Sequence, residues 1–227
     1  MHLLFIIALL LLAVFGPGLW VRHVLETYSQ PADRYAGTGA QLARHLLDKN
    51  GLAAVSVETT DTGDHYDPEA KAVRLTEDKY NGRSLTAITV AAHEVGHALQ
   101  DHEGYPPLRI RSKLVKATRG VERIGAATLI VAPFLGALTR APGLGILMFA
   151  AGLLTLGTST LVHFATLPTV FDASFGRALP MLDRFKILKS VDRRHARRLL
   201  RAAALTYVSA SLMSLLNIAR WWELLRR

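Results

Sequence analysis

The chain of 227 residues contains no cysteine, so disulfide bonds and thiolate metal sites are excluded. Acidic residues are also scarce, because 18 Asp and Glu stand against 27 Lys and Arg, a formal net charge of +9 at pH 7. An excess of this kind is common in nucleic-acid-binding proteins. Here, however, the basic residues flank uncharged apolar stretches, which is the pattern of membrane proteins. We therefore expect no nucleic-acid partner, and we expect a lipid bilayer to surround part of the chain.

The N-terminal segment 1–22 is predicted to be a retained membrane anchor. Leu3–Val21 contains no charged residue and is about long enough to cross a bilayer. A cleaved signal peptide is the alternative, and it would have Lys or Arg before the apolar run and a small-residue cleavage site after it. Only His2 precedes the run, so the anchor is the favoured interpretation.

Two later segments also lack charge. A transmembrane helical hairpin is predicted over 124–166, because its two apolar runs are separated only by Arg140 and the turn-like stretch 141–143. A transmembrane or interfacial helix is predicted over 202–222, which ends in two tryptophans as interfacial anchors do. Together with the N-terminal anchor, these segments predict a mainly α-helical integral membrane protein with about four transmembrane helices.

The distribution of Lys and Arg predicts which segments face the cytoplasm. Residues 22–123 hold fourteen of these residues and residues 167–201 hold nine, whereas the hairpin turn holds one and the C-terminal tail three. By the positive-inside rule, the two rich segments are cytoplasmic. The segment 167–201 is therefore expected on the same side of the membrane as everything between the anchor and the hairpin.

Residues 30–110 are predicted to form a small α+β unit. Apolar spacing indicates the helices, and alternation of apolar with polar residues indicates the strands. Ser84 is the expected N-cap of the second helix. Helix, two strands and helix is the order expected of a zincin-type core, and one of the strands is expected to offer an edge to an extended peptide. In chain order we expect a helix at Thr38–Asn50, a strand at Ala53–Thr59, a turn at Gly63–Pro68, a strand at Lys71–Glu77 and a helix at Leu85–Gln100.

The second predicted helix carries the motif HEVGH. His93 and His97 are four residues apart, so they share one helix face and can bind one Zn²⁺. Glu94 can reach a metal-bound water and is the candidate general base for peptide hydrolysis. The alternative is a buried helix with two hydrogen-bonded histidines. A metal is favoured because burying Glu94 without a partner among alanines and valines would be costly.

A third protein ligand must come from outside the motif. The metzincin pattern fails, because Gln100 and Glu103 stand where its glycine and its last histidine belong. A carboxylate on a later helix is the other common arrangement. Asp172 is the only acidic residue between Glu122 and Asp183, and it lies in the segment expected on the same side of the membrane as the motif.

Several stretches together resemble the YugP-like neutral zinc metallopeptidases, a family of bacterial membrane proteins. They are LLDKNGLAAVSVE, DHYDPEAKAVRLTED, VAAHEVGHALQ, the apolar hairpin and LPTVFDASFGRALPML, in this order. The resemblance implies a membrane-bound endopeptidase with one Zn²⁺ per chain, a multi-pass protein of the bacterial inner membrane. Its site would face the cytoplasm, and its substrates would be membrane or membrane-proximal proteins. His93 and His97 match the family's first two ligands, and Glu94 matches its base.

One position departs from the family. The family motif commonly reads L-P-V-E-F-D-A-S, and this chain has Val170 in place of the glutamate. Because Asp172 is retained, we predict it as the third zinc ligand, carried by a helix within 167–201. Asp172 could instead cap a helix or hold a ligating histidine from outside the ligand set. A degenerate site is the remaining alternative, and the chain would then be a catalytically inactive membrane scaffold or pseudoprotease.

Overall fold

The computed structural model describes residues 2–117, 143, 150, 162 and 166–205. Its contacts divide the chain into two units. One unit comprises Met1–Gly16, Ile110–Thr166 and Tyr207–Arg227, and the other comprises Pro17–Arg109 and Leu167–Thr206. The second, hereafter the motif unit, contains both HEVGH and Asp172.

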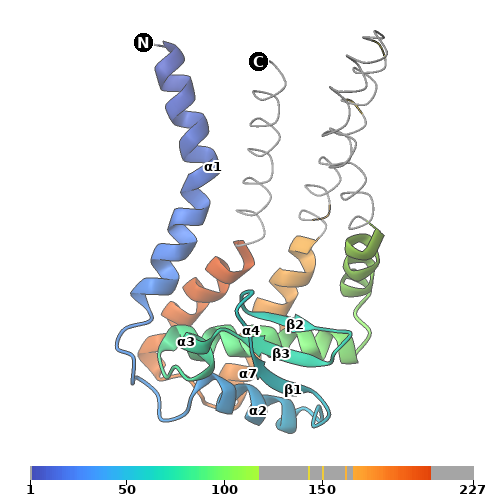
Figure 1. The fold of residues 1–227 in the computed structure, drawn as a ribbon. Coiled ribbons are helices and arrows are strands. Elements are labelled where there is room, and N and C mark those ends of the chain that lie inside the picture. Colours follow the sequence, from blue (N-terminus) through green and yellow to red (C-terminus); the bar gives the residue numbers. More distant parts are fainter. Residues whose placement is uncertain (1, 118–142, 144–149, 151–161, 163–165, 206–227) are drawn as a thin grey trace. The chain divides into compact units, whose positions relative to one another are not determined.

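The helices and strands labelled in Figure 1 are α1 (His2–Thr27), α2 (Gly39–Lys49), β1 (Ser56–Thr59), β2 (His65–Asp67), β3 (Ala72–Leu75), α3 (Glu77–Tyr80), α4 (Leu85–His102) and α7 (Leu179–Arg184). The chain also forms the π-helix η1 (Asp172–Ala178) and the 3₁₀ turn η2 (Ser190–Asp192). Residues 106–117, 166–171 and 193–205 are helical as well. The helix predicted to carry HEVGH is therefore present as α4.

Helix α4 is the centre of the motif unit. Every residue from Leu85 to Gln100 is buried, and a helix without an exposed face must be covered on all sides. The cover comes from α2, the sheet and η1, which all pack on α4 (Figure 1). Ser84 begins the helix, because its hydroxyl accepts a hydrogen bond from the amide of Ala87 at 3.2 Å. The predicted N-cap is thus confirmed.

Helix α2 follows its local sequence closely. The Thr38 hydroxyl accepts from the amide of Gln41 while the Gln41 side chain accepts from the amide of Thr38, which forms a reciprocal capping box. The helix stops before Gly51, whose φ of 73° lies in the left-handed region that favours glycine. Leu42, Leu46 and Leu47 are buried on one face, so the predicted helix and its apolar stripe are confirmed.

The sheet has three strands in the order β1-β3-β2, where the sequence predicts two. Strand β3 pairs in parallel with β1 and antiparallel with β2. The additional strand is β2, which lies within the predicted turn Gly63–Pro68. Its central residue Tyr66 pairs with Val73 and is buried. The turn itself is shorter and follows Asp67, whose Oδ1 accepts from the amides of Glu69 and Ala70. Since β3 is central, β1 and β2 are the strands with an outer edge.

The prediction of about four transmembrane helices is wrong for the part of the chain that the structure describes. No helix there combines the length and the apolar character needed to cross a membrane. The predicted hairpin, 124–166, and most of the predicted C-terminal helix, 202–222, fall outside the described residues. At the end of the predicted anchor, Val21 packs with Val24 against Leu85 and Leu199. Composition alone assigned Val21 to a membrane anchor, whereas in the structure this residue is buried in a protein core.

A buried ion pair ties the loop after α1 to the turn η2. The side chain of Asp192 is fully buried. Its carboxylate accepts hydrogen bonds from the guanidinium of Arg34 and from the hydroxyl of Tyr35, the latter at 2.7 Å. The Arg34 hydrogen bonds are the main reason why the pKa of Asp192 lies below its ordinary value. Residues far apart in the sequence are therefore joined by a charge-assisted contact.

Candidate metal centre

The structure brings the two histidines of the motif together on one face of α4. Their ring centroids are 4.9 Å apart and the ring planes meet at 78°. His93 is 3% exposed and His97 4% exposed. Two imidazoles so close and so well shielded from water are suited to bind one cation between them.

The partner of His93 fixes its tautomer. Nδ1 of His93 lies 3.0 Å from the hydroxyl oxygen of Ser174, and that hydroxyl also donates to the carbonyl of Leu200 at 3.3 Å. A carbonyl can only accept, so a Ser174 hydroxyl that donates to Leu200 accepts from Nδ1 of His93. In that arrangement Nε2 is the metal-binding atom of His93.

Gln100 fixes the tautomer of His97 by the same logic. The Gln100 amide nitrogen donates to the carbonyl of Thr169 at 2.8 Å and to Oδ2 of Asp172 at 2.7 Å. The amide oxygen, 2.9 Å from Nδ1 of His97, must then be the acceptor of that contact. Nδ1 of His97 is therefore the donor in this contact. With both Nδ1 atoms in contact with protein groups, Nε2 is the atom through which each ring would bind a metal.

Asp172 is the first residue of the π-helix η1, and this geometry determines its neighbours. In a π-helix the hydrogen bonds join residues five apart, as the amide of Leu179 and the carbonyl of Ser174 show. Arg177 is five residues after Asp172 and donates from Nε to Oδ2 at 2.8 Å. In an α-helix these two side chains would point in different directions. Asp172 thus accepts from both Gln100 and Arg177.

Arg177 extends the network to the end of α4. Its Nη1 atom donates to Glu103 at 2.6 Å, and its guanidinium lies 5.5 Å from the centroid of the Tyr105 ring. Burial lowers the pKa of Arg177, but hydrogen bonds to Glu103 and Asp172 outweigh that effect and raise the pKa above its ordinary value. Arg177 therefore remains charged and holds the Asp172 carboxylate beside Gln100.

The predicted site residues are assembled only in part. Glu94 follows His93 directly in the sequence, and it is buried, with 6% of its surface exposed. Asp172 is joined to His97 through Gln100. Among residues 2–117 and 166–205, no cluster of three or more His, Asp or Glu is placed to hold a metal. The assignment of Asp172 as a ligand therefore stays a prediction. Val170, at the position of the family's glutamate, is fully buried.

Two further features bear on how well a metal fits. Thr89 lies four residues before His93, on the same face of α4, and its buried hydroxyl has no hydrogen-bond partner among the described residues. A buried hydroxyl without a partner is costly, so a polar group bound at this face would stabilise it. Gly96 lets η1 approach closely, because a Cβ there would lie 2.6 Å from the carbonyl oxygen of Ala173. The donor set on α4 therefore fits a zinc ion with two protein ligands in place.

Sequence reasoning missed the two residues that orient the histidines. Gln100 is three residues after His97, on the same helix face, and this spacing is a usable signal. Ser174 gives no such signal, because it meets His93 only through the packing of η1 on α4. Both residues act on Nδ1 atoms, and a search limited to metal-ligating side chains passes over them.

Comparison with known proteins gives one family and one curated relative. A family model described as "Putative neutral zinc metallopeptidase" matches residues 2–226. A protein of Bacillus subtilis (strain 168) named "Putative membrane protease YugP" is 37% identical over 218 residues, which cover 93% of each chain. No solved structure matches the chain. The match to the family extends over nearly the whole sequence and includes every residue of the candidate site.

Proposed function

Because the chain belongs to the neutral zinc metallopeptidase family, we propose that it is a zinc-dependent endopeptidase that hydrolyses peptide bonds. His93 and His97 are the first two zinc ligands, and Glu94 is the general base. The observation that carries this proposal is the pair of Nδ1 contacts, with Gln100 and Ser174, because they make Nε2 the metal-binding atom of two histidines on one helix face.

Each residue has a distinct task in this proposal. Bound zinc would supply an acidified water and an electrophile for the scissile carbonyl. Glu94 takes the proton of the attacking water and later delivers it to the leaving amine. Gln100 and Ser174 keep the two imidazoles neutral and correctly rotated. The burial of the site excludes bulk water, which strengthens the electrostatic interactions inside it.

For the third ligand we propose Asp172, with an orienting role as the alternative. In the ligand role the carboxylate binds zinc directly. In the orienting role it holds Gln100, and through Gln100 it holds His97, which matches the contacts of the structure. The variants Asp172→Ala and Asp172→Asn separate the two roles. If Asp172 is a zinc ligand, both variants lose zinc binding. If Asp172 orients Gln100, only Asp172→Ala loses it, because the side-chain oxygen in Asp172→Asn still accepts from Gln100.

We also propose that the protein acts at the cytoplasmic membrane, on its cytoplasmic side, against membrane or membrane-proximal proteins. Support comes from the Bacillus subtilis relative, which is named a putative membrane protease. The 23 Lys and Arg residues of segments 22–123 and 167–201 add to it, because clusters of positive charge favour the cytoplasmic face of a membrane. Labelling of single introduced cysteines from either side of intact cells tests the sidedness, since the chain has no cysteine of its own.

Zinc content and peptidase activity, measured together, test the catalytic proposal. The wild type should hold one zinc per chain, His93→Ala should hold none, and Glu94→Gln should keep zinc but lose hydrolysis. His45→Ala is a matched control, because His45 is exposed on α2 and contacts Phe185 rather than the site. Hydrolysis that survives in Glu94→Gln would contradict the assigned base.

The second candidate function is an inactive scaffold, favoured by the buried Val170 and by the absence of a three-residue metal cluster among the described residues. Restoring the family's residue with Val170→Glu distinguishes the two. If position 170 holds the missing ligand, the variant gains zinc and activity over the wild type. If Asp172 completes the site, Val170→Glu places a carboxylate in an apolar environment and lowers stability by about 1–3 kcal/mol without gain of zinc.

A further inference from the structure

Four arginines form a stripe on the helix 193–205, outside the candidate metal centre. Arg194, Arg197, Arg198 and Arg201 are spaced three and four residues apart, so they lie on one side of the helix. All four are exposed, while Ala196, Leu199 and Leu200 on the other side are buried in the core. The helix therefore presents an arginine-rich face to its surroundings.

This stripe is unfavourable for the helix that carries it. Like charges three and four residues apart repel each other, and cations near a helix N-terminus oppose the helix dipole. Among the described residues no acidic side chain forms a salt bridge with any of the four arginines of the stripe. The charge of Arg197 lowers the pKa of Asp183 without forming a salt bridge with it. By contrast, neighbouring Arg193 pairs with Asp183 at 2.8 Å. The positive charge of the stripe is therefore available to bind an anionic partner outside the described residues.

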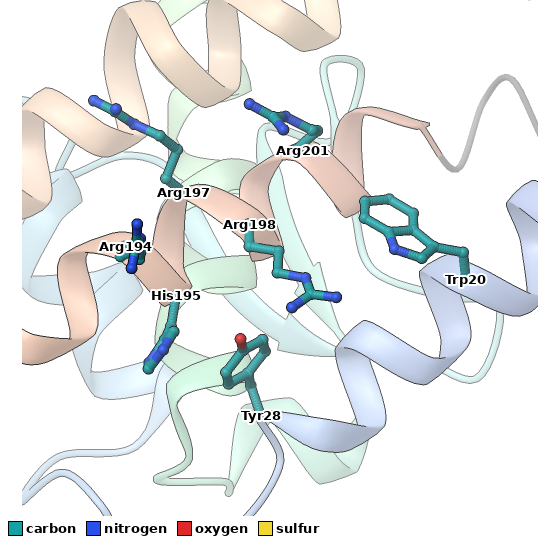
Figure 2. A pocket seen from close by; sticks show the side chains of 7 residues that line it. All are labelled: Trp20, Tyr28, Arg194, His195, Arg197, Arg198 and Arg201. Carbon is teal, nitrogen blue, oxygen red and sulfur yellow. The ribbon is translucent and has the colours of Figure 1, made fainter.

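The stripe lines a pocket of about 600 Å³ together with residues of the α1 segment. Trp20 and Tyr28 form its other wall, and His195 stacks on Tyr28 with ring centroids 5.0 Å apart. Figure 2 shows the Arg198 side chain reaching between Trp20 and Tyr28. No acidic residue is among those that line the pocket in the described part of the chain. The pocket therefore combines strong positive charge with two amphipathic aromatic rings.

We propose that this pocket binds the phosphate group of an anionic phospholipid. Guanidinium groups match the geometry of phosphate oxygens with paired hydrogen bonds. Trp and Tyr rings are preferred at the level of lipid headgroups, where one end of the ring is apolar and the other meets water. The site is separate from His93 and His97, and it does not depend on the proposed peptidase activity.

The chain on both sides of the pocket favours a lipid over a free phosphate. Leu3–Val21, which contains Trp20, has no charged residue, and neither does the run 202–219 that follows Arg201. Leu19, next to Trp20, is 65% exposed. Apolar sequence that directly adjoins the pocket residues along the chain suits the acyl chains that a phospholipid brings with its headgroup. A soluble phosphate would make no use of it.

Native mass spectrometry of the full-length protein in detergent tests the assignment, with phosphatidylglycerol and phosphatidylcholine offered as equal competitors. The wild type should retain phosphatidylglycerol. Joint replacement of Arg194, Arg198 and Arg201 by Gln should reduce that retention about tenfold or more, since each basic residue contributes on the order of 1 kcal/mol near anionic lipid. Joint replacement by Lys keeps the charge but removes the paired hydrogen bonds, and should give an intermediate loss.

A charge-matched control replaces Arg22, Lys49 and Arg83 by Gln, three exposed residues that do not line the pocket. It should leave phosphatidylglycerol binding unchanged, and circular dichroism should show equal helix content in all variants. An equal loss in the control would overturn the site in favour of a net-charge effect. Equal retention of both lipids, or displacement of phosphatidylglycerol by millimolar inorganic phosphate, would overturn the lipid assignment.

Discussion

At the residue scale, Gln100 is the side chain on which the geometry of the candidate metal centre depends most. It accepts from His97 and donates to Thr169 and Asp172. An amide is well suited here because it offers an acceptor on one side and two donors on the other. No other uncharged side chain of similar length provides both. A histidine ligand held in this way loses little rotational freedom when a metal binds.

Truncation of Gln100 should weaken zinc binding without removing a ligand. In Gln100→Ala, Nδ1 of His97 loses its acceptor, and zinc affinity should fall about 10–100-fold, the range measured for residues that hold metal-ligating histidines. Competition with a fluorescent zinc chelator measures this. Gln30→Ala, an exposed truncation of the same kind, is the control. Undiminished affinity in Gln100→Ala would contradict the orienting role.

The residues that could be predicted were those whose chemistry is local. His93, Glu94 and His97 stand out because their spacing alone puts them on one or adjacent helix faces. Thr38 and Ser84 stand out because capping needs only the next three residues. The hydroxyl of Ser174 reaches His93 from 81 residues away. Rules of local sequence do not relate residues so far apart. This contact follows only from the packing of η1 on α4.

At the scale of elements, Gly96 controls how closely η1 approaches α4. In an exposed helix, replacing Gly by Ala gains about 1 kcal/mol in helix propensity. Here the new Cβ would lie 2.6 Å from the backbone oxygen of Ala173, and overpacking of this kind costs roughly 1–3 kcal/mol. Gly96→Ala should therefore lower stability and, by moving η1, loosen the contact between Ser174 and His93.

Thermal unfolding combined with zinc affinity checks this prediction. Gly37→Ala is the matched control, because its nearest neighbour would be the side-chain oxygen of Gln41 at 3.4 Å, an ordinary van der Waals distance. The control should change neither quantity appreciably. A Gly96→Ala protein that is as stable as the wild type and binds zinc equally well would mean that the close approach is not required.

The ion pair between Arg34 and Asp192 should make stability depend on acid pH. The folded-state pKa of Asp192 is lowered, chiefly by the Arg34 hydrogen bonds, so the folded protein binds fewer protons than the unfolded chain at acid pH. Its contribution is fully present above the unfolded pKa of about 3.9 and disappears as pH falls through the folded pKa. Asp192→Asn should cost about 2 kcal/mol at neutral pH. Urea unfolding between pH 3 and 7 should show the two proteins converging at the acid end; a constant difference would contradict the prediction.

Strand pairing shows the limit of sequence reasoning at this scale. The alternation of Val73 and Leu75 with polar residues marked β3 correctly, because both side chains lie on a buried face of that strand. Strand β2 has only three residues and carries turn-forming neighbours, so its pairing with β3 overrides its local preference. The π-helix was likewise unpredictable, since η1 has no composition that distinguishes it from an α-helix.

At the scale of the whole molecule, a zinc ion bound only by the folded state should add to stability by mass action. At a free zinc concentration of 100 times Kd, the gain is about 2.7 kcal/mol, which corresponds to a rise in Tm of roughly 5–10 °C for a chain of this length. Treatment with a chelator should therefore lower the Tm of the wild type by this amount and leave that of His93→Ala unchanged. Scanning calorimetry measures both; an equal response of the two proteins would place the stabilising metal elsewhere.

Composition predicted transmembrane helices, and no helix in the described part of the chain has the length and apolar character to cross a membrane. An uncharged run is equally compatible with lipid and with protein as its surroundings, and Val21 and Val24 have protein around them. The same uncertainty does not affect the motif unit, where α4 is buried on all sides. An apolar segment can therefore be assigned to lipid or to a protein core only when its contacts are known.

The π-helix η1 has a consequence for how this segment tolerates a change of length. A π turn holds one residue more than an α turn, so loss of one residue between Asp172 and Arg177 would allow the segment to close into an ordinary α-helix. The deletion removes the residue that the wider turn accommodates, so the helical residues on either side would keep their faces. Asp172 and Arg177 would then stand four residues apart, the spacing at which side chains meet on an α-helix, and their ion pair would survive in the shorter segment.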